Sequence, residues 1–157
     1  MNARPSRPAS LSVGLAGLMI LFANAAPAQQ AQPAAQVAAA SPAVKQKAVF
    51  AVSDADPQKW SLTLGNIANA IDALGKDGAD IELVAYGPGI QMLKKDSPVA
   101  ARIAEALRSG LRIEACQNSM KGFHLEPADM APGVGYVPSG VVELMKRQHD
   151  GYAYIRS

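Results

Sequence analysis

The chain has 157 residues, enough for one ordinary domain, and it is 49% hydrophobic but only 18% charged. Arg4 and Arg7 are the only charged residues among the first 44, which leaves 13 of the 15 Lys and Arg to balance 13 Asp and Glu in the rest. That balance excludes a basic nucleic-acid binder, which needs clustered positive charge. A single cysteine excludes an internal disulfide and a cysteine-rich zinc site.

Residues 1–28 have the three parts of a secretory signal peptide. Two arginines precede an apolar run at 11–22, which is shorter than the ~20 residues that span a bilayer. Small-residue cleavage sites then lie before Ala26 and before Gln29. We expect a periplasmic or secreted protein with no stable membrane insertion after cleavage; the alternative is a membrane anchor that is never cut.

Residues 29–44 consist mainly of Ala, Gln and Pro and contain no large side chain. Such a segment buries too little surface to offset its ordering entropy, which predicts a flexible linker. The folded domain is therefore expected at 45–157.

The first half of this domain alternates between strand and helix patterns. A buried strand is expected at 48–52, and Asp56-Pro57 gives the N-cap and first-turn proline of a helix. That helix carries one apolar face, formed by Trp60, Leu64, Ile67, Ile71 and Leu74. A second strand follows at 81–86, and Ser97-Pro98 repeats the cap-and-proline pattern before another helix.

The second half continues the alternation. A third strand at 111–115 ends at Cys116, an irregular segment covers 117–133, and a short strand is expected at 134–137. Ser139 is predicted to cap a helix, and a last strand covers 152–155. The residues expected to share a face of this helix are Val141, Leu144, Met145 and Gln148. Strands separated by helices predict an α/β fold with a parallel sheet and helices on both faces.

Cys116 is the sharpest candidate for chemistry. Ligands of open parallel sheets bind beyond the carboxyl ends of the strands, where Cys116 is expected to lie. If residues 117–120 begin a helical turn, its free N–H groups favour a thiolate, and Lys121 and His124 would add positive charge. The alternative is a small buried hydrophobic residue, a common role of free cysteine.

Two other groups of residues have two interpretations each. Gly87, Pro88 and Gly89 would present N–H groups to an anion, or form a tight turn after a strand. Asp54 and Asp56 would bind a hard cation, or serve as a turn acid and an N-cap.

The two histidines, His124 and His149, lack partners at metal-ligand spacing, so we expect no metal site and no cofactor. His124 is the better placed of the two to carry a proton. No nucleotide-binding, zinc-protease or serine-hydrolase motif is present.

Several segments of residues 47–157 resemble the DsrE/DsrF-like family. They are Tyr86-Gly87-Pro88-Gly89-Ile90, Asp96-Ser97-Pro98-Val99-Ala100, Ala115-Cys116-Gln117-Asn118-Ser119-Met120, residues 130–141 and Gly151-Tyr152-Ala153-Tyr154-Ile155. The resemblance implies a three-layer α/β/α sandwich around a five-stranded, mainly parallel sheet. It also implies association into trimers or hexamers.

The resemblance suggests one function, and the residues leave a second open. In the family's sulfur-relay members a cysteine after the third strand carries a persulfide, and Cys116 matches that position. A carrier would take sulfur from a small donor or a partner relay protein, with Gln117, Asn118 and Ser119 cradling the outer sulfur. The second possibility is a non-catalytic, oligomeric module that binds a small ligand, with Cys116 lining its pocket. Whether the protein is an enzyme stays open.

The segment 117–133 is more apolar than a solvated loop requires. Its large apolar residues are Met120, Phe123, Leu125 and Met130. They are expected either to contact another copy of the chain or to fold back onto the domain's own core.

Overall fold

Five short strands and the helices between them make up the computed structural model, which describes residues 44–157. The strands are β1 (Gln46–Val52), β2 (Ala79–Ala85), β3 (Arg112–Cys116), β4 (Gly135–Val137) and β5 (Ala153–Arg156). The helices are α1 (Pro57–Leu74), α2 (Ala100–Arg108), α3 (Gln117–Gly122) and α4 (Gly140–His149), with 3-10 helices η1 (Gly87–Leu93) and η2 (Pro127–Asp129). The predicted leader, 1–28, and all but the last residue of the predicted linker lie outside the described residues.

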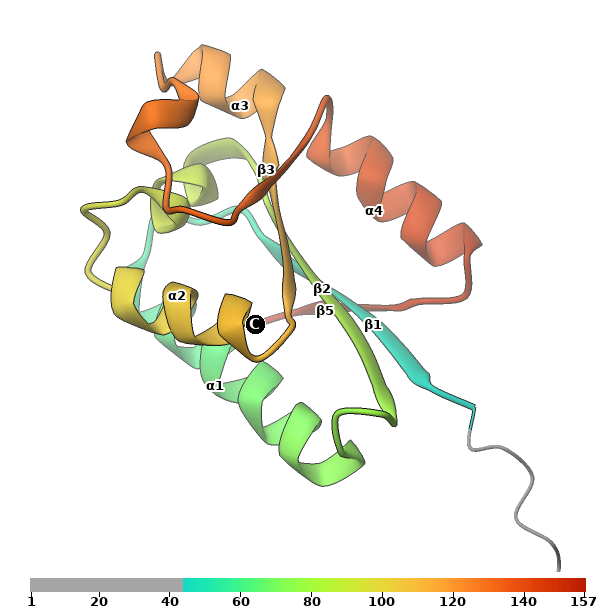
Figure 1. Ribbon diagram of the computed structural model, residues 1–157. Helices are drawn as coiled ribbons and strands as arrows, with labels where there is room; N and C mark the ends of the chain where they lie inside the picture. Colours follow the sequence, from blue (N-terminus) through green and yellow to red (C-terminus); the bar gives the residue numbers. More distant parts are fainter. Residues whose placement is uncertain (1–43) are drawn as a thin grey trace, which may run out of the picture. The chain divides into compact units, whose positions relative to one another are not determined.

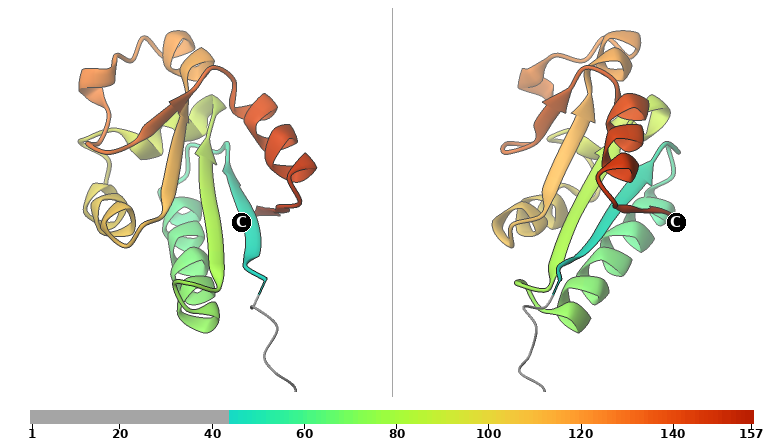
Figure 2. Two further views of the ribbon diagram at one scale, coloured as in Figure 1. Left: turned by 45° about the vertical axis from the view of Figure 1, so that its right-hand side comes forward. Right: turned by 90° about the vertical axis from the view of Figure 1, so that its right-hand side faces the viewer.

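The strands form one sheet in the order β4-β3-β2-β1-β5, and every neighbouring pair is parallel. Helices α1 and α2 cover one face and α4 covers the other (Figures 1 and 2), which confirms the expected three-layer α/β fold. The chain adds β2, β3 and β4 on one side of β1, then crosses to place β5 on the other side. The direction of winding therefore reverses between β1 and β5.

The main core lies between the sheet and helices α1 and α2. Phe50, Leu83 and Ile113 point from three adjacent strands toward an apolar layer on the helices. The buried helix residues in this layer are Trp60, Leu64, Ile67 and Ile103. Helix α1 begins as predicted, because the Asp56 carboxylate accepts a hydrogen bond of 2.8 Å from Gln58 N and Pro57 takes the first helical position.

On this side of the sheet, one sequence expectation needs correction, and the structure favours one of the two alternatives given for residues 117–133. Helix α2 begins at Ala100 with Val99 as its N-cap, because Ser97 instead forms a local turn in which its hydroxyl accepts from Val99 N at 3.4 Å. The apolar residues of 117–133 mainly face inward: Met120 and Met130 are each 4% exposed, and Leu125 packs against the core. Only Phe123 remains substantially exposed, so most of this segment completes the domain's own core.

Helix α4 does not bury the apolar face that its sequence predicted. It buries Gly140, Glu143 and Leu144, whereas Val141 and Met145 are 52% and 64% exposed. The cause lies in the sheet beneath the helix, where β2 places Glu82 on the same face as Val84. A buried carboxylate requires charged partners, and the charged side of α4 supplies one.

Within residues 44–157, no helix combines the length and the apolar character needed to cross a membrane.

The contact between Gly89 and β1 gives a direct test of this packing. A Cβ at position 89 would lie 2.4 Å from the carbonyl oxygen of Val52, and backbone cannot move aside cheaply. Gly89→Ala should lower the free energy of unfolding by about 1–3 kcal/mol, measured by denaturant unfolding. Gly122→Ala is the matched control because nothing lies within 4 Å of its Cβ position, and it should change stability by less than about 1 kcal/mol. Equal losses in the two variants would contradict the packing.

Candidate functional site

Cys116 is the last residue of β3, and helix α3 begins at the next residue. Because β1, β2 and β3 are adjacent and parallel, the loops that follow them meet at one edge of the sheet. Figure 1 shows α3 leaving the end of β3 at this edge, with the start of α4 nearby. The thiol is free and only 4% exposed.

The surroundings of the Cys116 sulfur favour its negative form. Burial alone raises the pKa of the thiol, but neighbouring hydroxyl and backbone N–H groups outweigh that effect and bring the pKa below its ordinary value. In order of importance, these groups are the Ser119 hydroxyl and the backbone N–H groups of Gly140, Ser119 and Asn118. The site can therefore hold a thiolate, the form of cysteine that acts as a nucleophile.

Ser119 connects the thiol to the loop after β2. The backbone N–H of Gly87 donates to Ser119 Oγ at 2.7 Å, which leaves the hydroxyl hydrogen free to point toward sulfur. Gly87 adopts φ 53, a left-handed conformation that glycine tolerates without strain. Gly87 thus supports the site through Ser119.

The rest of Gly87-Pro88-Gly89 forms a turn. The N–H of Gly89 is used within the chain, 3.1 Å from both Ser53 O and Tyr86 O. Pro88 has no N–H and lies in the first turn of η1. The geometry of this segment is thus that of a tight turn leaving β2.

Gly140 is a site residue that the sequence analysis missed. It begins α4, and a Cβ at this position would lie 3.2 Å from Cys116 Cβ and 2.8 Å from Tyr86 Cβ. Only glycine lets the start of α4 approach the thiol this closely. The sequence offers one signal, the pair Ser139-Gly140 after β4, but it does not show that β4 pairs with β3 beside Cys116.

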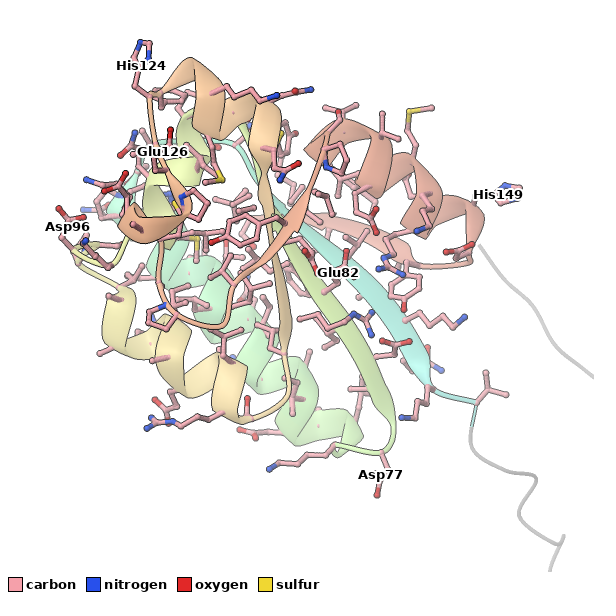
Figure 3. All side chains as sticks on the ribbon, turned by 45° about the horizontal axis from the view of Figure 1, so that its top comes forward. Asp77, Glu82, Asp96, His124, Glu126 and His149 are labelled. Atoms are coloured by element: carbon pink, nitrogen blue, oxygen red, sulfur yellow. The ribbon has the colours of Figure 1, made fainter. Side chains whose placement is uncertain are left out.

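Lys121 and His124 lie apart from the thiol. No hydrogen bond or ion pair within residues 44–157 joins either side chain to Cys116. Both line a groove of about 520 Å³ that does not include Cys116; its other lining residues are Gln117, Met120, Leu125, Glu126, Pro127 and Tyr136. Figure 3 shows His124 extending outward beyond α3 and His149 at the far end of α4.

Asp56 has the N-cap role proposed as the alternative to cation binding, whereas Asp54 forms two ion pairs. Asp56 caps α1, and Asp54 lies 3.2 Å from both Lys59 Nζ and Arg156 Nη2, at the reversal point between β1 and β5. Hydrogen bonds from Arg156 and Lys59 hold the pKa of Asp54 below its ordinary value. In the part of the chain that the structure describes, no group of three or more His, Cys, Asp or Glu residues is arranged to bind a metal ion.

The solved structures that resemble the chain include the following three. The protein of unknown function MTH1491 from Methanobacterium thermoautotrophicum is 32% identical, with a TM-score of 0.69 over 72% of this chain and 100% of its own. The YchN protein of E. coli is 17% identical (TM-score 0.58; 71% of this chain, 99% of its own). BT1422 of Bacteroides thetaiotaomicron, a conserved protein of unknown function, is 18% identical (TM-score 0.57; 71% and 95%). The last two support the fold alone.

No curated protein matches the chain. The model of the DsrE/DsrF-like family matches residues 46–156, which cover every strand and helix of the described domain. This range includes the segments on which the resemblance rests, among them Cys116 and the residues that follow it. The chain belongs to the DsrE/DsrF-like family, a family associated with sulfur relay.

Proposed function

We propose that this protein is an exported, thiol-dependent sulfur carrier in which Cys116 holds the transferred sulfur as a persulfide. One observation carries the proposal: Cys116 is the N-cap residue of α3 with the start of α4 packed against it, and the Ser119 hydroxyl and neighbouring backbone N–H groups bring the pKa of its thiol below the ordinary value. A cysteine that only filled space in a core would have no need of these groups. Family membership supports the same chemistry.

The transfer step needs no external oxidant or reductant. The Cys116 thiolate attacks the outer sulfur of a persulfide or polysulfide donor and forms a new sulfur–sulfur bond. The donor's own sulfur–sulfur bond breaks, and the donor leaves as a thiolate. In the reverse direction, an acceptor thiolate takes the outer sulfur and Cys116 returns to its thiolate form.

Gly140 joins Ser119 and Asn118, two of the residues expected from the sequence to cradle the outer sulfur. Ser119, Asn118 and Gly140 stabilise negative charge on sulfur during both directions of transfer. Lys121 and His124 line the neighbouring groove and are assigned no part in the sulfur chemistry. Because Cys116 is nearly buried, the donor has to be small or has to displace the start of α4.

Persulfide loading tests the carrier function. Purified protein treated with polysulfide should gain one sulfur on Cys116, detected by mass spectrometry after alkylation, whereas Cys116→Ser should gain none. The loading rate should rise with pH and level off, with a midpoint below the ~8.5 of a free thiol, because the thiolate is the reacting form. Ser119→Ala should move that midpoint upward.

His149→Ala, at the far end of α4, is the matched control and should load like the unmodified protein. A thiol that loads only after denaturation would overturn the carrier proposal. That result would favour the alternative, a small-ligand binding module in which Cys116 lines the pocket.

We also propose that the protein self-associates through the outer face of α4. Val141, Val142 and Met145 are 52–64% exposed there, which is unusual for three neighbouring apolar side chains. Light scattering on the mature protein should give a mass of three or six chains, and Val142→Lys should reduce it. Leu62→Lys on α1, at a similarly exposed apolar residue, should leave the mass unchanged. A monomer at tens of micromolar would rule out this association.

Export is tested by the mature N-terminus. Protein recovered from an exporting host should have the intact mass of a chain that begins at Gln29 or Ala26, because the apolar run is short and two small-residue sites follow it. Ala28→Arg combined with Ala25→Arg should block processing. A full-length chain retained in the membrane fraction would support the uncut anchor.

A further inference from the structure

Helix α4 turns its charged side inward and its apolar side outward. Leu144 is its one large apolar residue in the core, where it meets a small cluster completed by Val49, Ala51, Val84 and Tyr152. Glu143 is buried beside it, and Arg147 is 21% exposed. Apolar contact alone therefore does little to fix the helix on the sheet.

An ion pair with the sheet holds the C-terminal half of α4, and a second pair lies within the helix. Arg147 Nη2 lies 2.8 Å from Glu82 Oε2 on β2, and Arg147 Nε lies 2.9 Å from Glu143 Oε1. Glu82 is fully buried in the middle of the sheet, and Figure 3 shows it between β2 and α4. The same oxygen of Glu82 also receives Arg112 Nε from β3 at 3.1 Å. One buried carboxylate oxygen thus joins a helix arginine and a strand arginine.

The N-terminal end of α4 rests on the thiol site. A Cβ on Gly140 would lie within 3.4 Å of Tyr86, Cys116 and Val84. Val84 and Glu82 share one face of β2, because alternate strand residues point the same way. Gly140 and Arg147 likewise share one face of α4, two helical turns apart. A single strand therefore holds both ends of the helix, with an ion pair at one end and close packing at the other.

We propose that Arg147 is a positioning residue: by binding Glu82 at one end of α4, it keeps Gly140 against Cys116 at the other end. This inference rests on the proposed role of Cys116 as the reacting thiol. Without the anchor, the few apolar contacts of α4 allow its start to move away from sulfur. The Gly140 N–H then no longer helps to stabilise the thiolate.

The comparison of Arg147→Met with Arg112→Met tests this proposal. Both variants remove one positive charge from the same oxygen of Glu82, but only Arg147 belongs to α4. The readout is the ultraviolet absorbance of the thiolate as a function of pH, with Cys116→Ser as the blank. Arg147→Met should raise the pKa of Cys116 by about one unit, the size of one lost interaction with a charged group, and Arg112→Met should raise it by less than half as much.

Arg147→Lys keeps the positive charge beside Glu82, so it provides a variant that folds even if Arg147→Met does not. It loses the forked contact of the guanidinium with two carboxylates. It should shift the pKa of Cys116 upward by a smaller amount. Equal shifts in Arg147→Met and Arg112→Met, or no shift in either Arg147 variant, would overturn the positioning role. An ordinary thiol pKa in the unmodified protein would instead reject the proposed function, so the two failures are distinguishable.

Discussion

The parallel pairing of β3 between β2 and β4 is the constraint on which the site depends. It brings the ends of three strands to one edge, so that the residues that follow them share a small volume. Cys116 ends β3, Gly87 follows β2, and Gly140 follows β4 after a short turn. Each contributes to the same sulfur: Gly140 directly, and Gly87 through the hydroxyl of Ser119. A change in strand order would separate these residues without altering any single helix or strand.

The two faces of the sheet are stabilised by different kinds of interaction. The α1 and α2 side is a continuous apolar core, whereas the α4 side contains a buried carboxylate with two arginines and only a small apolar cluster. Buried ion pairs contribute modestly to net stability. They fix geometry because a buried charge that loses its partner is strongly destabilising. That property suits the side of the sheet on which a helix has to hold its first residue against a thiol.

The sequence predicted most of the strands and helices because their periodicities are strong and their turns contain Gly and Pro. Helix α1 shows this best, since an N-cap, a proline and one apolar face agree along its length. Cys116 could be placed at a strand end for the same reason. The orientation of α4 could not be predicted from its own residues, because it depends on Glu82. That residue lies on β2, which is far from α4 in the sequence. Nearness along the chain does not show which groups face a side chain: Lys121 and His124 follow Cys116 closely, yet both line a groove that does not include it.

The proposed role of Cys116 is to carry sulfur in the working protein. Its most direct test is peptide mass spectrometry on protein taken from its producing cells and alkylated at the moment of lysis. A fraction of Cys116 peptides should contain one additional sulfur, and a reducing agent applied before alkylation should remove it. Cys116 recovered only as an unmodified thiol, from cells actively supplied with a sulfane donor, would show that it does not carry sulfur.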